Sequence, residues 1–305
     1  MKKTLIRFSS ALLLLVTVFT LCSFTAAASA PESIPDSRTV SKKYLSVYGV
    51  RSKQIGSYAR KSVYINGKAA AYSGRIIDGV AYLPVKSFLE NVTRARVSYS
   101  SATKTLSAYG NGYDISLSDG AYVVYSSGRP MFSMMPAVVL SDGNMYAPIS
   151  TLSRAVGVRA SYSGGSQISV YGTAAPIPTA SKFYREDEVY WLARIINAES
   201  RGEPLIGQIA VGGVVLNRVK SPLYPNTIWS VIFDKKYGVQ FSPILDGSIY
   251  SEPGYTSILA AKICLEGFSV SDETLFFLYP RASTSSWIPK NREYVFSIGK
   301  HDFYK

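Results

Sequence analysis

Two kinds of hydrophobic pattern divide the chain. Within residues 31–180, β-branched and Tyr residues alternate with polar ones in short runs such as Ser62–Ile65 and Ala121–Tyr125, which is the period of half-buried strands. A Pro stands at the start of two other segments, Val85–Asn91 and Ile149–Val156, where we expect short helices. The first half of the chain is therefore predicted to be rich in β-structure.

The second half opens with a helical pattern. Leu192, Ile195, Ile196 and Glu199 follow the spacing that places side chains on one face of a helix. Three acidic residues at 186–188 suit its first turn, where the helix dipole favours negative charge. A Gly and a Pro just beyond end the helix.

Glu199 is thus a carboxyl at the end of an apolar stripe, which is a structural error or a functional position. Apolar surroundings and the negative helix end both disfavour the charged form and raise the pKa. A glutamate with a pKa of about 6–7 can hold a proton and donate it to a leaving oxygen. The alternative is a structural glutamate paired with Arg194 or Arg201.

The first half also repeats itself at an interval of 62 to 64 residues. The matching pairs are Asp78-Gly79 with Asp142-Gly143, Tyr82–Val85 with Tyr146–Ile149, Val97–Ser100 with Ala160–Ser163, and Tyr109-Gly110 with Tyr171-Gly172. We therefore expect two copies of one unit, each an antiparallel sheet with a short helix.

Composition separates the two halves further. Residues 31–180 hold 16 Lys and Arg against 7 Asp and Glu, whereas residues 181–305 hold 14 against 13. The segment Thr173–Ser181 is small, uncharged and contains Pro, which is typical of a linker, and we place the linker at residues 173–182. The predicted domains are residues 40–172 and 183–305.

Residues 1–30 have the pattern of a secretory signal peptide. Three basic residues precede the apolar run Ala11–Leu21, and Ala28-Ser29-Ala30 suits a cleavage site. An uncleaved anchor is the alternative, and Leu21 argues against acylation at Cys22. Cleavage predicts a secreted protein with no stable membrane insertion. Its one remaining cysteine, Cys264, lies in an apolar run and is expected to be buried and inert.

The motif order in Tyr58–Gly172 resembles the copper amine oxidase N-terminal-like domain, in which V-x-I-N-G-K, D-G-x-x-Y-L-P-V and V-S-Y follow one another. No copper is expected, since residues 31–180 contain neither His nor Cys. One interpretation is attachment to anionic wall polymers through basic and Tyr side chains. The other is a plain spacer. Nucleic acid is not an expected partner of an exported protein.

The second half resembles the catalytic domain of SleB-type cell wall hydrolases over Val189–Tyr304. The motifs that carry this resemblance are Asn197–Pro204, Gly207–Val211, Val214–Val219, Tyr224–Thr227, Val231–Phe233, Gln240–Ser242, Asp246-Gly247, Trp287 and Ile298–Phe303. The resemblance implies an α+β domain of the lysozyme and lytic-transglycosylase style that cuts the MurNAc–GlcNAc backbone of peptidoglycan, with Glu199 as catalytic residue. It also implies that the secreted protein is associated with the cell wall or the spore. Leu278-Tyr279-Pro280 departs from the family's aromatic-Asn-Pro.

The number of available acids bears on the mechanism. Ordinary glycosidases need two carboxylates, but Glu203 and Asp246 are each better explained as turn residues. In lytic transglycosylases one glutamate suffices, because the C6 hydroxyl of the same MurNAc attacks and closes a 1,6-anhydro ring. A water-using muramidase or glucosaminidase, or a wall-binding protein without activity, are the alternatives.

Several side chains have the chemistry to bind sugars: Gln240, Ser242, Tyr279 and Trp287. His301, the one histidine, either borders the site or packs in the core. Gly212-Gly213 within an apolar helix is expected to permit close packing against the helix of Glu199. We expect no metal and no cofactor.

Overall fold

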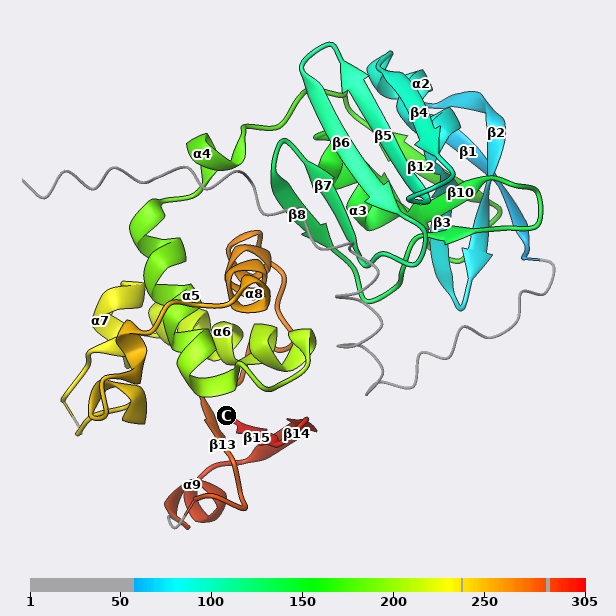
Figure 1. The fold of residues 1–305 in the computed structure, drawn as a ribbon. Helices are drawn as coiled ribbons and strands as arrows, with labels where there is room; N and C mark the ends of the chain where they lie inside the picture. Colours follow the sequence, from blue (N-terminus) through cyan, green and yellow to red (C-terminus); the bar gives the residue numbers. More distant parts are fainter. Residues whose placement is uncertain (1–57, 237, 284–285) are drawn as a thin grey trace, which may run out of the picture. The chain divides into compact units, whose positions relative to one another are not determined.

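Strands dominate the first half of the computed structural model, which describes residues 58–236, 238–283 and 286–305 (Figure 1). The predicted signal peptide and Cys22 lie outside these residues. The elements of this half are β1 (Arg60–Ile65), β2 (Lys68–Ile77), β3 (Val80–Pro84), α2 (Val85–Thr93), β4 (Arg96–Ser100), β5 (Thr105–Gly110), β6 (Tyr113–Ser118), β7 (Val123–Ser126), β8 (Arg129–Phe132), β9 (Val138–Val139), β10 (Met145–Pro148), α3 (Ile149–Ala155), β11 (Arg159–Ser161) and β12 (Gln167–Tyr171).

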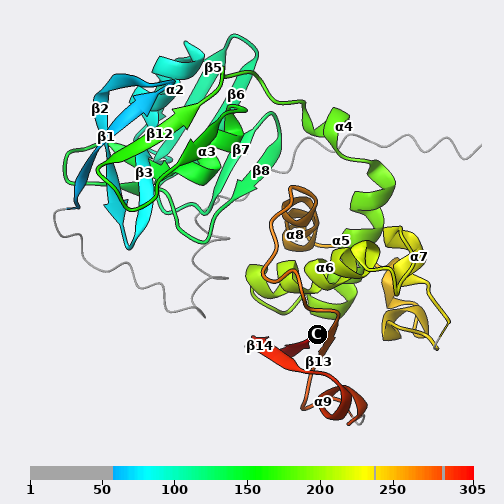
Figure 2. The same cartoon turned by 180° about the vertical axis from the view of Figure 1, so that it is seen from behind.

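The strands form two sheets with α2 and α3 packed against them (Figures 1 and 2). One sheet has the order β11-β12-β1-β2-β3-β10-β9, and the other has the order β4-β5-β6-β7-β8. The two repeats meet where β3 and β10 pair, with Leu83 opposite Ala147. As predicted, both helices begin directly after a Pro, at Pro84 and Pro148.

One strand pairing differs from the predicted antiparallel pattern. Within the described residues, β1 and β12 pair in parallel, with Val63 opposite Ile168. This contact joins the first strand of the first repeat to the last strand of the second. A pairing between residues more than 100 positions apart leaves no trace in local periodicity.

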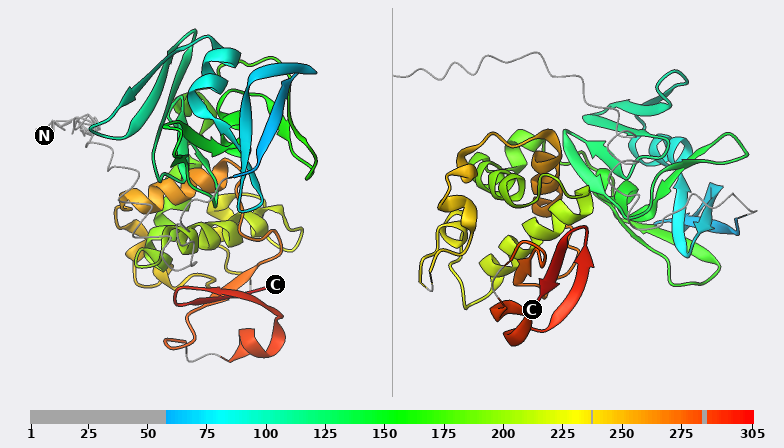
Figure 3. Two further views of the ribbon diagram at one scale, coloured as in Figure 1. Left: turned by 90° about the vertical axis from the view of Figure 1, so that its right-hand side faces the viewer. Right: turned by 60° about the horizontal axis from the view of Figure 1, so that its bottom comes forward.

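Helices dominate the second half, as expected for the α+β domain (Figures 1 and 3). Its elements are α4 (Ala180–Phe183), α5 (Glu186–Ser200), α6 (Leu205–Lys220), α7 (Ile228–Ile232), the short 3₁₀ helices η2 (Ser242–Ile244) and η3 (Ser248–Tyr250), α8 (Tyr255–Leu265), β13 (Phe276–Leu278), α9 (Trp287–Asn291), β14 (Tyr294–Ile298) and β15 (His301–Tyr304). None of the described helices is long and apolar enough to cross a membrane.

Three mutually packed helices, α5, α6 and α8, form the centre of this half. A Cβ on Gly212 would lie 2.8 Å from both the Cδ1 atom of Ile196 and the Sγ atom of Cys264. The glycine therefore permits the close approach of α6 to α5, as predicted. Cys264 is buried, and burial raises its pKa to about 12, so the thiol is inert.

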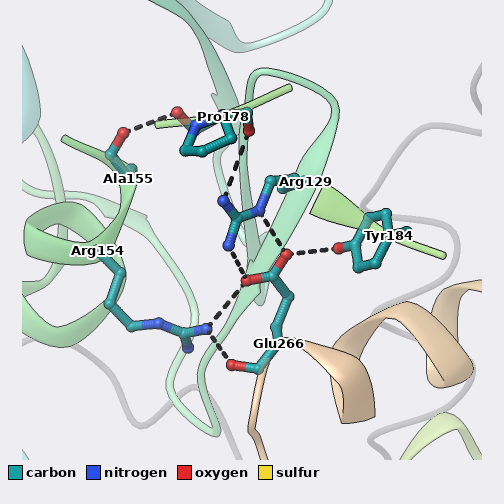
Figure 4. A network of polar contacts seen from close by, with 7 residues as sticks. Arg129, Arg154, Ala155, Pro178, Tyr184 and Glu266 are labelled. Atoms are coloured by element: carbon teal, nitrogen blue, oxygen red, sulfur yellow. Dashed lines mark hydrogen bonds and ion pairs between the residues drawn. The ribbon is translucent and has the colours of Figure 1, made fainter. Parts of the chain in front are cut away.

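A buried ion-pair network connects strand β8 to the end of α8 (Figure 4). The Glu266 carboxylate accepts hydrogen bonds from the Nε and Nη2 atoms of Arg129 at 2.8 and 2.9 Å, and from the Tyr184 hydroxyl. Arg154 lies 3.5 Å from the same carboxylate and donates to the Glu266 carbonyl oxygen at 2.8 Å. The two halves are thus packed through desolvated charges rather than only tethered.

The segment that joins the two halves lies against the β-rich half. Residues 173–179 form no helix or strand, and α4 begins at Ala180, inside the predicted linker. The Ala175 N–H donates to the Val156 carbonyl at 3.0 Å, and the Ala180 N–H donates to the Ser127 carbonyl at 2.9 Å. The segment is therefore bonded to the β-rich half along its length.

Candidate active site

Helix α5 carries Glu199 in its last turn, on the face predicted from the sequence. Leu192, Ile195 and Ile196 on that face are fully buried, and they hold the helix against the core. The Glu199 side chain itself is only partly exposed. The carboxyl therefore lies at the edge of an apolar core.

Burial raises the pKa of Glu199 from 4.5 to about 7. The negative charge of Asp246 raises this pKa further, while the positive charge of Arg218 lowers it. The predicted direction is confirmed, and its largest cause is desolvation. Near neutral pH the carboxyl can both hold a proton and release it.

Arg218 is the charged neighbour that the sequence analysis left without a role. It lies on α6, 5% exposed, and its Nε donates to the Leu275 carbonyl at 2.8 Å. Its guanidinium carbon lies 5.0 to 5.5 Å from the ring centroids of Tyr224, Phe241 and Phe276. Its Nη1 has no hydrogen-bond partner among the described residues.

The signal for Arg218 was present in the sequence. Val211, Val214, Val215 and Arg218 have the same one-face spacing that singled out Glu199. A charge at the end of an apolar stripe on each of two adjacent helices predicts a shared polar site. The two helices pack against each other in the structure, which brings the two charges together.

Glu203 has a structural role, as the sequence analysis expected. Its buried carboxylate accepts the Lys300 N–H at 3.0 Å and lies 4.0 Å from Nδ1 of His301. A Cβ on Gly299 would lie 1.7 Å from the same carboxylate oxygen, and Gly299 has a φ of +59°. Glu203 thus ties the start of α6 to the turn between β14 and β15.

Asp246 is a turn residue, also as expected, but it has a second role. Its exposed carboxylate accepts the Ser248 N–H at 2.8 Å, and hydrogen bonds from Ser248 lower its pKa. The carboxylate is therefore ionised at neutral pH. Its negative charge raises the pKa of Glu199, whereas that of Asp234 acts on Arg218.

Three of the four predicted sugar-binding residues adjoin, in sequence or in space, a ring that lies beside Arg218. Gln240 and Ser242 flank Phe241, and Gln240 donates to the Gly238 carbonyl at 3.0 Å. Trp287 is half-exposed, with its ring 6.3 Å from that of Phe276.

Tyr279 lies deeper, 6.3 Å from the ring of His301. His301 is itself buried, and burial lowers its pKa, against the opposing charges of Glu203 and Asp302. The sugar-binding role of Gln240, Ser242, Tyr279 and Trp287 stays a prediction.

A separate pocket of about 410 Å³ lies beside α4, α5 and α8. Tyr184, Tyr190, Ile258 and Lys262 are among its lining residues, and none of the predicted site residues lines it. This pocket is therefore separate from the predicted site around Glu199. A proton-holding carboxyl beside a guanidinium and aromatic rings can act as a general acid on a polar, ring-shaped substrate.

The fold and the site define a protein with a β-rich first half and a helical second half that carries a protonatable glutamate. Residues 64–171 match the copper amine oxidase N-terminal domain, and residues 202–304 match the cell wall hydrolase family. The second half of the chain therefore contains a segment that matches the cell wall hydrolase family, as predicted from its motifs. The matched range begins three residues after Glu199, so the role of Glu199 is argued from its geometry.

Individual relatives agree with this assignment. The chain is 38% identical over 120 residues to a spore cortex-lytic enzyme of Bacillus subtilis, covering 39% of this chain and 38% of the relative. It is 32% identical over 167 residues to a spore cortex-lytic enzyme of Oceanobacillus iheyensis, covering 54% and 59%. The chain thus spans less than two thirds of the length of these relatives.

Among solved structures, the chain is 36% identical to the catalytic domain of the germination-specific lytic transglycosylase SleB from Bacillus anthracis. That match covers 42% of this chain and 100% of the other, with a TM-score of 0.37.

Proposed function

We propose that this protein is a secreted enzyme that cleaves the MurNAc–GlcNAc backbone of peptidoglycan in the cell wall or spore cortex, with Glu199 as its general acid. One observation carries the proposal: a glutamate whose pKa is raised to about 7 by burial lies three residues before the segment that matches the cell wall hydrolase family. The names of the relatives, spore cortex-lytic enzymes, support the same substrate.

The proposed reaction is that of a lytic transglycosylase. Glu199 donates its proton to the glycosidic oxygen as the bond from that oxygen to C1 of MurNAc breaks. The C6 hydroxyl of the same MurNAc attacks C1, and its proton passes to the Glu199 carboxylate. The products are a 1,6-anhydro-MurNAc end and a free GlcNAc hydroxyl, and Glu199 returns to its acid form. No cofactor takes part in this scheme.

The electrostatics of the site fit both half-steps. Burial keeps the carboxyl protonated before cleavage, and Arg218 stabilises the carboxylate that forms after it. A group that must donate and then accept a proton works best when its pKa is near the working pH.

A water-using hydrolase is the second candidate, and Asp246 favours it. Its ionised carboxylate acts on Glu199 and could serve as the base or nucleophile that ordinary glycosidases require. Glu203 is a weaker candidate, because its carboxylate is engaged by the Lys300 N–H.

Mass spectrometry of fragments released from purified peptidoglycan and spore cortex separates the two candidates. We expect anhydro ends from residues 31–305, no fragments from Glu199→Gln, and anhydro ends still from Asp246→Asn. Reducing ends that disappear in Asp246→Asn would establish the hydrolase. No fragments from either substrate would indicate a wall-binding protein without activity.

The first half is proposed to hold the enzyme at the wall after export and removal of residues 1–30. Its excess of basic residues supports an anionic partner, and a spacer is the alternative. Binding of intact walls by the inactive Glu199→Gln chain tests this role separately from cleavage.

A further inference from the structure

Four residues on one face of two equivalent hairpins are the same in the two repeats of the β-rich half. In the first, Arg96 lies opposite Tyr109 and Ser98 lies opposite Ser107, between β4 and β5. In the second, the same pairs recur between β11 and β12 as Arg159 with Tyr171 and Ser161 with Ser169. We call each set of four an Arg-Ser-Ser-Tyr cluster. Residues directly opposite in an antiparallel pair point to the same face, so each cluster is one continuous patch.

The buried faces of the same hairpins are not the same in the two repeats. Val97 corresponds to Ala160, Leu106 to Ile168, and Ala108 to Val170. Leu106, Ala108, Ile168 and Val170 are core residues. On the same face Tyr99 and Tyr162 are identical, and on the outer face Thr105 corresponds to Gln167, so the identity is concentrated at the four outer positions without being confined to them. Arginine, serine and tyrosine side chains gathered on one sheet face have the chemistry to bind a polar, charged ligand.

Most members of the clusters are accessible. Tyr109 is 62% exposed and Tyr171 is 46% exposed, and both arginines are exposed. Ser98 and Ser161 are exposed as well, whereas Ser107 is partly covered and Ser169 is buried. An arginine, a tyrosine face and a serine hydroxyl are therefore presented together in each repeat.

The net charge of the β-rich half indicates the charge of the ligand. Residues 58–172 hold 11 Lys and Arg against 5 Asp and Glu. Seven of the basic residues form no ion pair within the described part of the chain: Arg60, Lys61, Lys68, Arg94, Arg96, Lys104 and Arg159. The ligand is therefore an anion, and guanidinium groups recognise phosphate and carboxylate through paired N–H donors.

We propose that the two Arg-Ser-Ser-Tyr clusters are paired binding sites for a linear phosphodiester polymer of the wall with sugar or polyol units. The guanidinium binds the phosphodiester, and the tyrosine and serine contact the sugar or polyol between charges. Two identical sites suit a ligand that repeats, since engaging both raises the affinity beyond that of either. The inference rests on the proposed attachment of this half to the wall.

The first cluster lies on β4 and β5, on the same sheet face that the helical half contacts at β7. Tyr109 pairs with Asp114 on β6, and Ser116 two residues on pairs with Tyr125 on β7. The Tyr125 hydroxyl lies 2.9 Å from that of Tyr255 on α8. A polymer bound at the first cluster would therefore lie on the same sheet face as the junction with the catalytic half.

The two clusters differ in one charged neighbour. The exposed carboxylate of Asp114 stands beside Tyr109 in the first cluster and opposes an anion there. In the second, the amide of Asn66 lies at the equivalent side, bonded to the backbone of Gly172 at 2.9 and 3.1 Å. The second cluster is therefore the stronger site, and removing the Asp114 charge should strengthen the first.

Cosedimentation of the inactive Glu199→Gln chain, residues 31–305, with purified Gram-positive walls tests the proposal. Two double variants are made in that chain. The arginine variant, Arg96→Ala with Arg159→Ala, should bind walls about tenfold or more weakly. The tyrosine variant, Tyr109→Ala with Tyr171→Ala, should also bind more weakly. Asp114→Asn should strengthen binding. Lys86→Ala with Lys182→Ala removes the same charge from the exposed faces of α2 and α4, away from both clusters, and should change binding little.

The ligand is identified by removing its phosphodiesters from the walls with hydrofluoric acid, and by competition with soluble polyglycerol phosphate. Both should abolish the difference between the arginine variant and its lysine control. Equal binding by these two variants on untreated walls would overturn the proposal. A difference that persists on stripped walls would assign the clusters to peptide-stem carboxylates and overturn the phosphodiester assignment.

Cleavage of soluble, polymer-free glycan is measured in parallel with the Glu199 versions of the same variants. Since the clusters do not take part in the reaction, their variants should cleave this substrate at the wild-type rate. A wild-type chain that binds walls through the clusters but cleaves nothing would refute the proposed activity and leave the binding sites in place.

Discussion

The raised pKa of Glu199 implies that replacing this residue with Gln stabilises the fold, and only at high pH. The pKa is about 7 in the folded chain and 4.5 as an ordinary side chain. Between these values the unfolded chain has lost the proton that the folded chain still holds. Stability contributed by that proton is complete below pH 4.5 and is lost as the pH rises through 7.

The magnitude follows from the shift. A pKa change from 4.5 to about 7 corresponds to about 3 kcal/mol of unfolding free energy at about 1.4 kcal/mol per pH unit. Glutamine has nearly the same shape as glutamate and no charge to desolvate. Glu199→Gln should therefore raise the free energy of unfolding by about 3 kcal/mol above pH 7 and leave it unchanged near pH 4.

Denaturant unfolding of both proteins at pH 4 and pH 8 measures the difference. Glu186→Gln is the matched control, because Glu186 is exposed in the first turn of the same helix. It should give no gain at either pH, since a carboxylate there is favoured by the helix dipole. An equal effect of Glu199→Gln at both pH values would refute burial of an ionisable group as the cause.

Three further variants probe the surroundings of the site and the junction between the halves. Arg218→Met removes the positive charge that stabilises the Glu199 carboxylate, so the alkaline limb of the cleavage rate should move to higher pH; an unmoved limb would contradict the coupling. Glu266→Gln removes the negative charge that pairs with the buried Arg129. The free energy of unfolding, measured in urea, should fall by up to about 3–5 kcal/mol. A fall of less than about 1 kcal/mol would mean that the ion-pair network is dispensable. Gly212→Ala forces a methyl group to within 2.8 Å of side chains on α5 and α8, and should cost about 1–3 kcal/mol by calorimetry, whereas a stabilised variant would show that the helices can separate.

Local signals accounted for much of the structure. The Pro residues before Val85 and Ile149 preset the first turn of each short helix, and both helices begin there. The stripe ending at Glu199 predicted both the buried face of α5 and the direction of the pKa shift. These features depend on neighbours within two turns of chain, which a sequence displays directly.

What the sequence did not reveal depends on contacts between distant segments. The parallel pairing of β1 with β12, the neighbours of Arg218 and the partners of Glu266 each join residues far apart in the chain. The Arg-Ser-Ser-Tyr clusters form an intermediate case. The repeat in the sequence already contained their matching residues. Only the strand register of the structure showed that Arg96 lies opposite Tyr109.

The pH dependence of glycan cleavage tests the central claim most directly, with wild-type residues 31–305 beside Glu199→Gln on purified peptidoglycan. The account expects the rate kcat/KM of the wild type to fall as the pH rises through about 7, where Glu199 loses its proton. It expects Glu199→Gln to be slower by a factor of about 10²–10⁴ or more at every pH. A Glu199→Gln chain that cleaves at the wild-type rate, with the same alkaline limb, would contradict it.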